Sequence, residues 1–160
     1  MKIIFVNSSP NAEGNTAALA KILLKNTAYE TLMLTDYKIY AYGQSFKDDE
    51  FDKVLQRLKD AETIVIGSPL YWHNLNGMLR NFMDRCYGNP MADGLKDKAL
   101  YFIIQGAAPE DWQIEACEYT MKRFCAYYNM VYKGKITNSS DAQKLQLNWL
   151  YIGVIDYAKF

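Results

Sequence analysis

The amino-acid sequence predicts an α/β protein in which five parallel strands form one doubly wound sheet with helices on both faces. Short runs of β-branched and aromatic residues alternate with longer segments of helical periodicity, and several of those runs are apolar almost throughout. Strands of a parallel sheet are buried on both faces and therefore carry few polar positions. Because no linker or repeat divides its 160 residues, the chain is expected to form a single domain over residues 1–160.

The first three elements follow one another closely. Residues Lys2 to Asn7 are mostly β-branched or aromatic, which predicts a buried strand that ends at the following Ser-Ser-Pro turn. Apolar residues three and four apart predict a helix over Asn15 to Asn26, with Gly14 or Asn15 at its start. A second, weaker strand is expected over Tyr29 to Leu34, and Asp36 to Phe46 shows no regular pattern.

A helix, a strand and another helix are predicted in the middle of the chain. Apolar residues from Phe51 to Leu58 recur at helical spacing, and Asp48 or Asp49 is expected to open this amphipathic helix. Thr63 to Gly67 is the clearest buried strand, and it is expected to stop at Ser68 and Pro69. The helix after it is predicted to carry its apolar residues on one face: Leu75, Met78, Leu79, Phe82, Met83 and Cys86.

The fourth and fifth strands flank a long helix. Ala99 to Gln105 is an apolar run closed by Gly106, which predicts the fourth strand. The helix is predicted over Glu110 to Tyr128, with Pro109 where a first-turn proline is tolerated. Met130 to Ile136 is expected to be the fifth strand.

The final segment, Asp141 to Ala158, is predicted to be helical, although the apolar residues from Leu145 to Ile155 also fit a strand. Five strands joined by right-handed crossovers favour the order 2-1-3-4-5 of flavodoxin-like sheets. In such sheets, ligands bind beyond the carboxyl ends of the strands. The loops expected to form a site are therefore Ser8 to Asn15, Ser68 to Asn74 and Gly106 to Asp111, here called the first, second and third loops.

Composition and charge exclude several classes of function. Lys+Arg and Asp+Glu both number 18, so the chain lacks the basic excess of a protein that binds nucleic acid through charge. No apolar run reaches the roughly 20 residues of a membrane span, and the N-terminal segment turns polar too early for a signal peptide. Cys86, Cys117 and Cys125 form no disulfide framework, and the single His73 excludes a multi-histidine metal site. A soluble cytoplasmic protein is expected.

The first loop predicts an anion site. It matches neither a dinucleotide fingerprint nor a Walker loop, but it lies where a strand ends and a helix begins. Unpaired backbone N–H groups and the positive end of the helix dipole attract an anion there, and Ser9, Asn11, Asn15 and Thr16 add neutral donors. The alternative is that these residues only form a turn and a cap.

The second loop is unusual for a surface connection because it places Tyr71 and Trp72 side by side. Aromatic and polar groups together are typical of a site for a planar heterocycle, whereas the alternative is aromatic packing under the following helix. The third loop contains Gly106, Ala107, Ala108 and Pro109, whose small side chains allow a ligand to approach the backbone.

Two stretches of sequence match a known family. Ser9, Pro10, Gly14, Asn15 and Thr16 are similar to a Ser-Pro-Arg…Gly-Asn-Thr phosphate loop, and residues 67–72 with 79–85 are similar to a Gly-Ser-Pro-x-Tyr…Leu-Lys-x-Phe-x-Asp-Arg segment. On these residues the chain resembles the NADPH-dependent FMN reductase and flavodoxin-like quinone reductase family. It departs from the family at Asn11, where many members carry arginine. Residues 37–49 also lack the cysteine-bearing loop of the iron-sulfur flavoprotein relatives.

The resemblance implies FMN as the cofactor and NADPH or NADH as the co-substrate, with hydride passing through the flavin to a small electron acceptor such as a quinone or a free flavin. It places the FMN phosphate against donors of the first loop: Ser9, Asn11, Asn15 and Thr16. It places the isoalloxazine ring against residues of the other two loops: Pro69, Leu70, Tyr71, Trp72, His73, Asn74, Gly106, Ala107 and Ala108.

Tyr71 and His73 are the candidate catalytic residues, because histidine titrates in a range suited to proton delivery to a reduced acceptor. Alternatively, His73 is a surface residue without a catalytic role. No metal, nucleic-acid or membrane partner is expected. Two other functions stay open: a flavodoxin-type FMN electron carrier, and a module that keeps the fold without the flavin. Clustered tyrosines are expected to form either a homodimer face or part of the core: Tyr37, Tyr40, Tyr42, Tyr127, Tyr128 and Tyr132.

Overall fold

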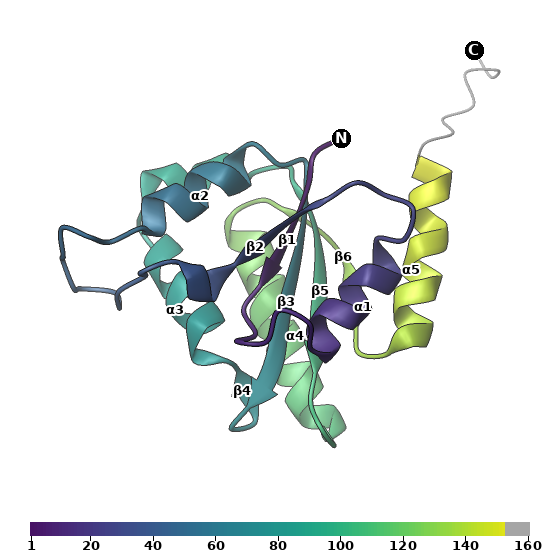
Figure 1. Ribbon diagram of the computed structural model, residues 1–160. Coiled ribbons are helices and arrows are strands. Elements are labelled where there is room, and N and C mark those ends of the chain that lie inside the picture. Colours follow the sequence, from purple (N-terminus) through teal and green to yellow (C-terminus); the bar gives the residue numbers. More distant parts are fainter. Residues whose placement is uncertain (153–160) are drawn as a thin grey trace, which may run out of the picture.

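Five parallel strands form the centre of the molecule: Ile3–Asn7 (β1), Glu30–Met33 (β2), Thr63–Tyr71 (β3), Ala99–Gln105 (β5) and Val131–Ile136 (β6). Figure 1 shows them in a computed structural model, which describes the backbone of residues 1–152 and the side chains of residues 1–146. The strands lie in the order β2-β1-β3-β5-β6. Counted among the parallel strands alone, this is the order 2-1-3-4-5, so the predicted fold class is confirmed.

Helices cover both faces of the sheet: Asn15–Leu23 (α1), Phe51–Lys59 (α2), Gly77–Cys86 (α3), Asp111–Tyr127 (α4) and Ser139–Ile152 (α5). In Figure 1, α1 and α5 lie on one side, and the buried side chains place α2, α3 and α4 together on the other. Two short 3-10 helices, Leu34–Asp36 and Pro90–Leu95, lie in the connections.

The core consists of two apolar layers, because successive side chains of a strand point to opposite faces of the sheet. Ile4, Ile64 and Phe102 pack in the layer under α2, α3 and α4. Phe5 and Val65 pack in the layer under α1. Each such side chain contributes about 1.5–3 kcal/mol when it is fully buried. The need to fill both layers explains why the central strands are apolar throughout.

One strand is longer than predicted. The strand expected to stop at Ser68 and Pro69 continues to Tyr71, and a two-residue strand, Asn74–Leu75 (β4), pairs with it antiparallel. Pro69 lies opposite Gln105 of β5 within the parallel register. Proline is compatible with the extended backbone and removes only one hydrogen-bond donor from the ladder. The second loop is therefore mostly a β-hairpin, and Leu75 belongs to β4 rather than to the following helix.

Helix starts differ from the prediction at two places. The residue that caps α2 is Glu50 rather than Asp48 or Asp49, although the Asp49 carboxylate accepts a hydrogen bond from the Phe51 N–H at 2.8 Å. Pro109 lies before Glu110, the N-cap of α4, and so stands outside the first turn. The first turn of α4 is closed instead by a capping box, in which Glu110 and Gln113 exchange side-chain-to-backbone hydrogen bonds.

The ends of the first and last helices complete the comparison. α1 ends at Leu23, and Asn26 adopts a left-handed φ of 64°, which no longer fits a helix. The final segment is helical through Ile152, which rejects the strand alternative for that part, and residues 153–158 of the prediction lie outside the described residues. None of the helices in the described part of the chain is both long and apolar enough to cross a membrane.

Candidate functional site

The three loops singled out in the sequence leave the sheet at the same edge. β1 and β3 are neighbours with Asn7 opposite Gly67, and β3 and β5 are neighbours with Pro69 opposite Gln105. Since the carboxyl ends of these parallel strands are adjacent, the first, second and third loops lie next to one another. This is the edge at which ligands bind in doubly wound sheets.

The first loop is wound by short side-chain-to-backbone hydrogen bonds. The Asn7 carboxamide oxygen accepts from the Ser9 N–H at 3.0 Å, and the Ser9 hydroxyl oxygen accepts from the Asn11 N–H at 3.1 Å. The Asn11 carboxamide oxygen accepts from the Glu13 N–H at 3.0 Å. These repeated turns use the residue types that compete best for local backbone groups. They bring the chain to Gly14, the N-cap of α1.

The start of α1 has donors without protein acceptors. Gly14 has no side chain to cap the helix, and no side-chain cap hydrogen bond is formed there. The hydroxyl of Thr16, which is 1% exposed, and the Nδ2 of Asn7 are buried without a hydrogen-bond partner. An unsatisfied buried polar group costs about 1–3 kcal/mol, which an incoming acceptor recovers. The helix terminus and the orphaned Thr16 hydroxyl together fit an anion such as a phosphate group.

The second loop contains a strained hairpin turn. Trp72 and His73 connect β3 to β4, and both have positive φ angles, 48° and 63°. A two-residue hairpin with this backbone normally carries Asn-Gly, because larger residues lose about 1–2 kcal/mol each in the left-handed region. Trp72 is also 95% exposed. Strained aromatic residues at the tip of a hairpin indicate that this turn serves a ligand rather than stability.

His73 is held by the start of α4. Gln113 Oε1 accepts from the Glu110 N–H at 3.0 Å, so its Nε2 is the donor to His73 Nδ1. This bond assigns the ring proton of neutral His73 to Nε2. Trp112 stacks on the imidazole with ring centroids 5.8 Å apart and planes at 26°. Neither Gln113 nor Trp112 is marked by a motif, because only the fold brings them to the second loop.

A cleft of about 250 Å³, here called the rim cleft, lies between the second and third loops. The side chains and backbone that line it include Leu70, Trp72, His73, Gly106, Ala107 and Gln113. A second cleft of about 310 Å³ extends from Gly106 to Asn15 at the start of α1. Gly106 belongs to both clefts, which gives one ligand access to both the anion site and the rim cleft. At Gly106 a Cβ atom would lie 3.2 Å from the Leu70 Cβ, so the glycine keeps this passage open.

Three of the predicted ring-binding residues do not line the rim cleft. Pro69 is buried in the sheet, and Tyr71 is partly exposed at the end of β3. The Asn74 carboxamide oxygen accepts from the Leu75 N–H at 2.8 Å and lies 4.0 Å from the Cys117 sulfur of α4. These residues shape the hairpin, whereas Trp72 and His73 face the cleft. Ser9, Asn11, Asn15 and Thr16 all lie on the first loop or the first turn of α1.

Asn76 joins the first two loops and has no counterpart among the predicted site residues. Its Nδ2 donates to the Ser8 carbonyl, and its backbone N–H donates to the Ser68 hydroxyl oxygen at 3.2 Å. Its Oδ1 caps α3 by accepting from the Leu79 N–H at 3.1 Å. Asn immediately before a helical glycine is a typical cap signal, but the link to Ser8 depends on the tertiary fold. Asn76 therefore fixes the first loop relative to the hairpin.

The cysteines are not part of this site. Cys86, Cys117 and Cys125 are buried free thiols, and burial raises the pKa of Cys125 to about 12. Because the thiolate is the reactive form, these side chains serve as small apolar residues. No group of three His, Cys, Asp or Glu side chains suited to a metal ion occurs among the described residues.

Comparisons with known proteins agree with the fold and the loops. A family model described as NADPH-dependent FMN reductase matches residues 1–144. The chain is 33% identical over 98 residues to an iron-sulfur flavoprotein of Archaeoglobus fulgidus, an alignment that covers 53% of this chain and 48% of that protein. It is 29% identical over 94 residues to YwqN of Bacillus subtilis, a protein named as an NAD(P)H-dependent FMN-containing oxidoreductase, covering 53% and 51% of the two chains. The chain thus spans about half the length of these two relatives.

The fold is similar to that of a solved structure, the Trp repressor binding protein from Bacillus subtilis. The TM-score is 0.74 at 19% sequence identity, and the match covers 89% of this chain and 98% of that chain. At this level of identity the likeness shows a shared flavodoxin-like fold.

Proposed function

Because the chain belongs to the NADPH-dependent FMN reductase family, we propose that it binds FMN as a single domain over residues 1–160 and uses NADPH or NADH to reduce a small electron acceptor. A quinone and a free flavin are the acceptors that we propose to test first. The observation that carries this proposal is the buried hydroxyl of Thr16, which has no partner and lies at the uncapped start of α1.

The first loop is proposed to hold the FMN phosphate. The N–H groups at the start of α1 and the Thr16 hydroxyl supply donors, and the helix dipole favours a negative group there. The Ser9 hydroxyl already accepts from the Asn11 N–H, so its own proton is free to be donated to a phosphate oxygen. These groups bind an anion without a cationic side chain. Asn11, in place of the family arginine, fits that arrangement because it winds the loop through its bond to Glu13.

The rim cleft is proposed to hold the isoalloxazine ring. Bound FMN supplies the redox chemistry by exchanging hydride with the nicotinamide and with the acceptor. Leu70 and the backbone at Gly106 and Ala107 form the walls of the cleft, and Trp72 lies at its rim. Gln113 keeps His73 in one orientation with its proton on Nε2, which suits the imidazole to donate a proton to a reduced acceptor. Tyr71 is the second proposed proton donor, next to Trp72 at the exposed end of β3.

Titration with FMN tests the phosphate site. The Thr16→Val variant keeps the shape of the side chain and removes the hydroxyl, and we expect it to weaken FMN binding by about tenfold or more, because a hydrogen bond to a charged group contributes about 1.5–3 kcal/mol. Without ligand, the same variant is expected to be at least as stable as the parent protein, since it removes an unsatisfied buried hydroxyl. Flavin fluorescence measures the binding, and urea unfolding measures the stability.

Thr16→Ser is the matched control, because it keeps the hydroxyl and should retain most of the affinity. A parent protein that does not bind FMN supports the alternative of a module without flavin. Equal FMN affinity in the parent and in Thr16→Val places the phosphate elsewhere. If the FMN-loaded protein is reduced only slowly by both NADPH and NADH under anaerobic mixing, the flavodoxin-type carrier is favoured instead.

A further inference from the structure

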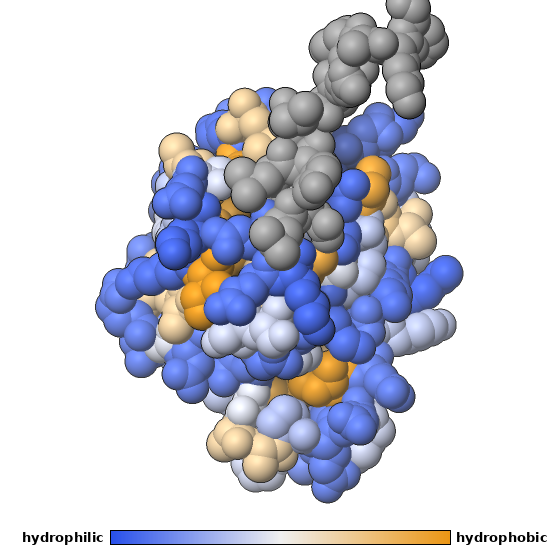
Figure 2. Space-filling model, turned by 90° about the vertical axis from the view of Figure 1, so that its right-hand side faces the viewer, coloured by the Kyte–Doolittle hydropathy of each residue, from blue (hydrophilic) through white to orange (hydrophobic). Residues whose placement is uncertain are grey.

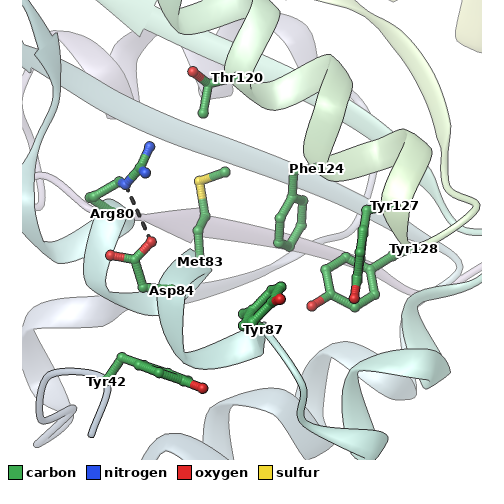
Figure 3. A pocket seen from close by; sticks show the side chains of 9 residues that line it. All are labelled: Tyr42, Arg80, Met83, Asp84, Tyr87, Thr120, Phe124, Tyr127 and Tyr128. Carbon is green, nitrogen blue, oxygen red and sulfur yellow. Dashed lines mark ion pairs between the residues drawn. The ribbon is translucent and has the colours of Figure 1, made fainter.

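A second concave surface, here called the tyrosine groove, lies between α3 and α4. Its volume is about 360 Å³, and it shares no lining residue with the rim cleft. Figure 3 shows that its walls are formed by Tyr42 from the loop before α2, Tyr87 at the end of α3, and Phe124, Tyr127 and Tyr128 from α4. The proposed redox reaction uses none of these residues.

The aromatic rings of the groove form a continuous row. Ring centroids lie 6.2 Å apart between Tyr42 and Tyr87 and between Tyr87 and Tyr127, and 4.9 Å apart between Tyr127 and Tyr128. The Tyr128 hydroxyl donates to the Cys86 carbonyl at 2.6 Å, which anchors the row to α3. The rings are thus ordered before any partner arrives, and little side-chain entropy remains to be lost on association.

The outer rings of the row are exposed although they pack on one another. Tyr42, Tyr87 and Tyr127 are among the most exposed large side chains of the described residues. Tyrosine is enriched at the centre of protein interfaces, where it supplies apolar area and a polar hydroxyl together. The face with α1 and α5, by contrast, is mostly hydrophilic, with small separate apolar spots (Figure 2). The aromatic concentration therefore distinguishes the α3–α4 face.

Charge identifies the partner of this face. Arg80 and Asp84 lie one turn apart on α3 beside the rings, with Nε and Oδ1 3.3 Å apart, and both side chains are half-exposed (Figure 3). A patch that carries one charge of each sign is complementary to itself when a two-fold axis places Arg80 of one copy against Asp84 of the other. The chain has equal numbers of basic and acidic residues, so two copies approach without net repulsion.

From the ordered tyrosines and this self-complementary pair, we propose that the tyrosine groove is the contact surface of a homodimer. In this dimer the α3 helices of the two copies lie antiparallel across a two-fold axis, and the rings of each copy fill the groove of the other. The proposal does not depend on FMN binding, and its tests use the full chain with no flavin required.

Sedimentation velocity over a wide range of concentration tests the aromatic part. The parent protein is expected to show twice the mass of the single chain. Tyr87→Ser and Tyr127→Ser each remove one outer ring and are expected to raise the dissociation constant by about tenfold or more. Tyr119→Ser is the matched control, because Tyr119 is an exposed tyrosine of α4 that does not line the groove. A dimer that both groove variants leave unchanged overturns the proposal.

Charge reversal tests the pairing between copies. Arg80→Asp places like charges across the axis, and so does Asp84→Arg, so each variant alone is expected to be monomeric. An equimolar mixture of the two variants is expected to form a heterodimer, because an acidic pair then faces a basic pair. Effects within one chain cannot be rescued by mixing, which separates the interface from helix stability. Lys21→Glu on α1 makes the same charge change far from the groove and is expected to leave the dimer intact.

Two results would reject the homodimer. One is a parent protein that stays monomeric at every concentration, which would leave the groove to a small planar ligand or to a different protein. The other is a mixture of the two charge variants that stays monomeric while both variants remain folded by circular dichroism. Failure of FMN to bind, on the other hand, would leave these results unaffected.

Discussion

The missing side chain at Gly67 determines how closely α1 lies against β3. A Cβ atom there would lie 2.5 Å from the Thr16 Cγ2 and 2.9 Å from a ring carbon of Phe5. Thr16 is the residue that places its hydroxyl at the proposed phosphate site, and Phe5 fills the layer under α1. Gly67 therefore allows both contacts at once.

Gly67→Ala is expected to lower the free energy of unfolding by about 1–3 kcal/mol, the usual cost of forcing extra volume into a packed core. It should also weaken FMN binding, because Thr16 must move away from the new methyl group. Urea unfolding and FMN titration measure the two effects. Gly77→Ala is the control, since a Cβ atom at Gly77 meets nothing within 4 Å. Equal effects of the two substitutions would contradict this explanation.

Site residues were predictable where their signal is local. Ser9, Asn11, Asn15 and Thr16 lie on a short polar stretch between a strand and a helix, and a sequence window reveals that pattern. Gln113, by contrast, is 40 positions from His73, and its role depends on the start of α4 reaching the hairpin. No periodicity or spacing connects the two. The sequence therefore predicted the anion site more completely than the surroundings of His73.

At the scale of elements, the hairpin between β3 and β4 trades stability for exposed aromatic groups. Replacing Trp72 by Asn and His73 by Gly supplies the residues that its left-handed turn favours. We expect this double variant to raise the free energy of unfolding by about 1 kcal/mol, because relief of the strained φ angles exceeds the entropy that glycine adds to the unfolded chain. We also expect the reduction of the acceptor to slow, since the rim cleft loses both rings. Thermal unfolding and steady-state kinetics measure these changes.

Asp97→Gly is a useful comparison for the hairpin variant. Asp97 also has a left-handed φ, 64°, but lies in the turn before β5, away from the three loops. This substitution should relieve strain without changing the reaction. A hairpin variant that is no more stable than the parent, or that retains full activity, would show that the Trp72–His73 turn is neither strained nor involved in catalysis.

The strands were predictable because each is a compact run of β-branched and aromatic residues between polar turns. β5 has the predicted bounds, and β1, β2 and β6 differ from the prediction by one residue at one or both ends. β3 is the exception, since Pro69 reads as a stop signal in sequence. The hydrogen bonds that continue β3 come from β5 and β4, which a one-dimensional pattern does not contain.

At the scale of the whole molecule, two carboxylates connect separate segments. Burial alone would raise the pKa of Asp49, but hydrogen bonds from the Arg85 guanidinium and the Phe51 N–H outweigh burial and hold this pKa below its usual range. Burial likewise opposes ionisation of Glu118, and contacts with Lys135 and Lys122 hold its pKa below the usual range. The first pair ties the loop before α2 to α3, and the second ties α4 to β6.

These shifts predict the response to acid. Because both pKa values are lower in the folded protein than in the unfolded chain, where they are about 4, the unfolded chain binds more protons as the pH falls through this range. Their contribution to stability is therefore present above about pH 4 and is lost as the pH falls through the folded values. Asp49→Asn is expected to be less stable than the parent at neutral pH and to lose less stability on acidification. Urea midpoints between neutral pH and about pH 3 test this.

Asp52→Asn serves as the control for the acid experiment, because Asp52 is an exposed residue of α2 that makes none of the ion pairs found in the described part of the chain. Its urea midpoints should fall with pH as steeply as those of the parent. An Asp49→Asn curve parallel to the parent curve would mean that the pair with Arg85 contributes nothing to acid sensitivity.

The three hydrogen bonds of Asn76 affect how this fold can diverge in evolution. Aspartate lacks the donor that reaches the Ser8 carbonyl, and glutamine is one methylene longer than the distance to Leu79 allows, so few other residues can occupy the position. Trp72 and His73 take no part in these bonds. Mutations at the hairpin tip can therefore accumulate, and change which molecules are accepted, while the neighbouring loop keeps its place. New specificities can arise in this scaffold without first sacrificing the older part of its site.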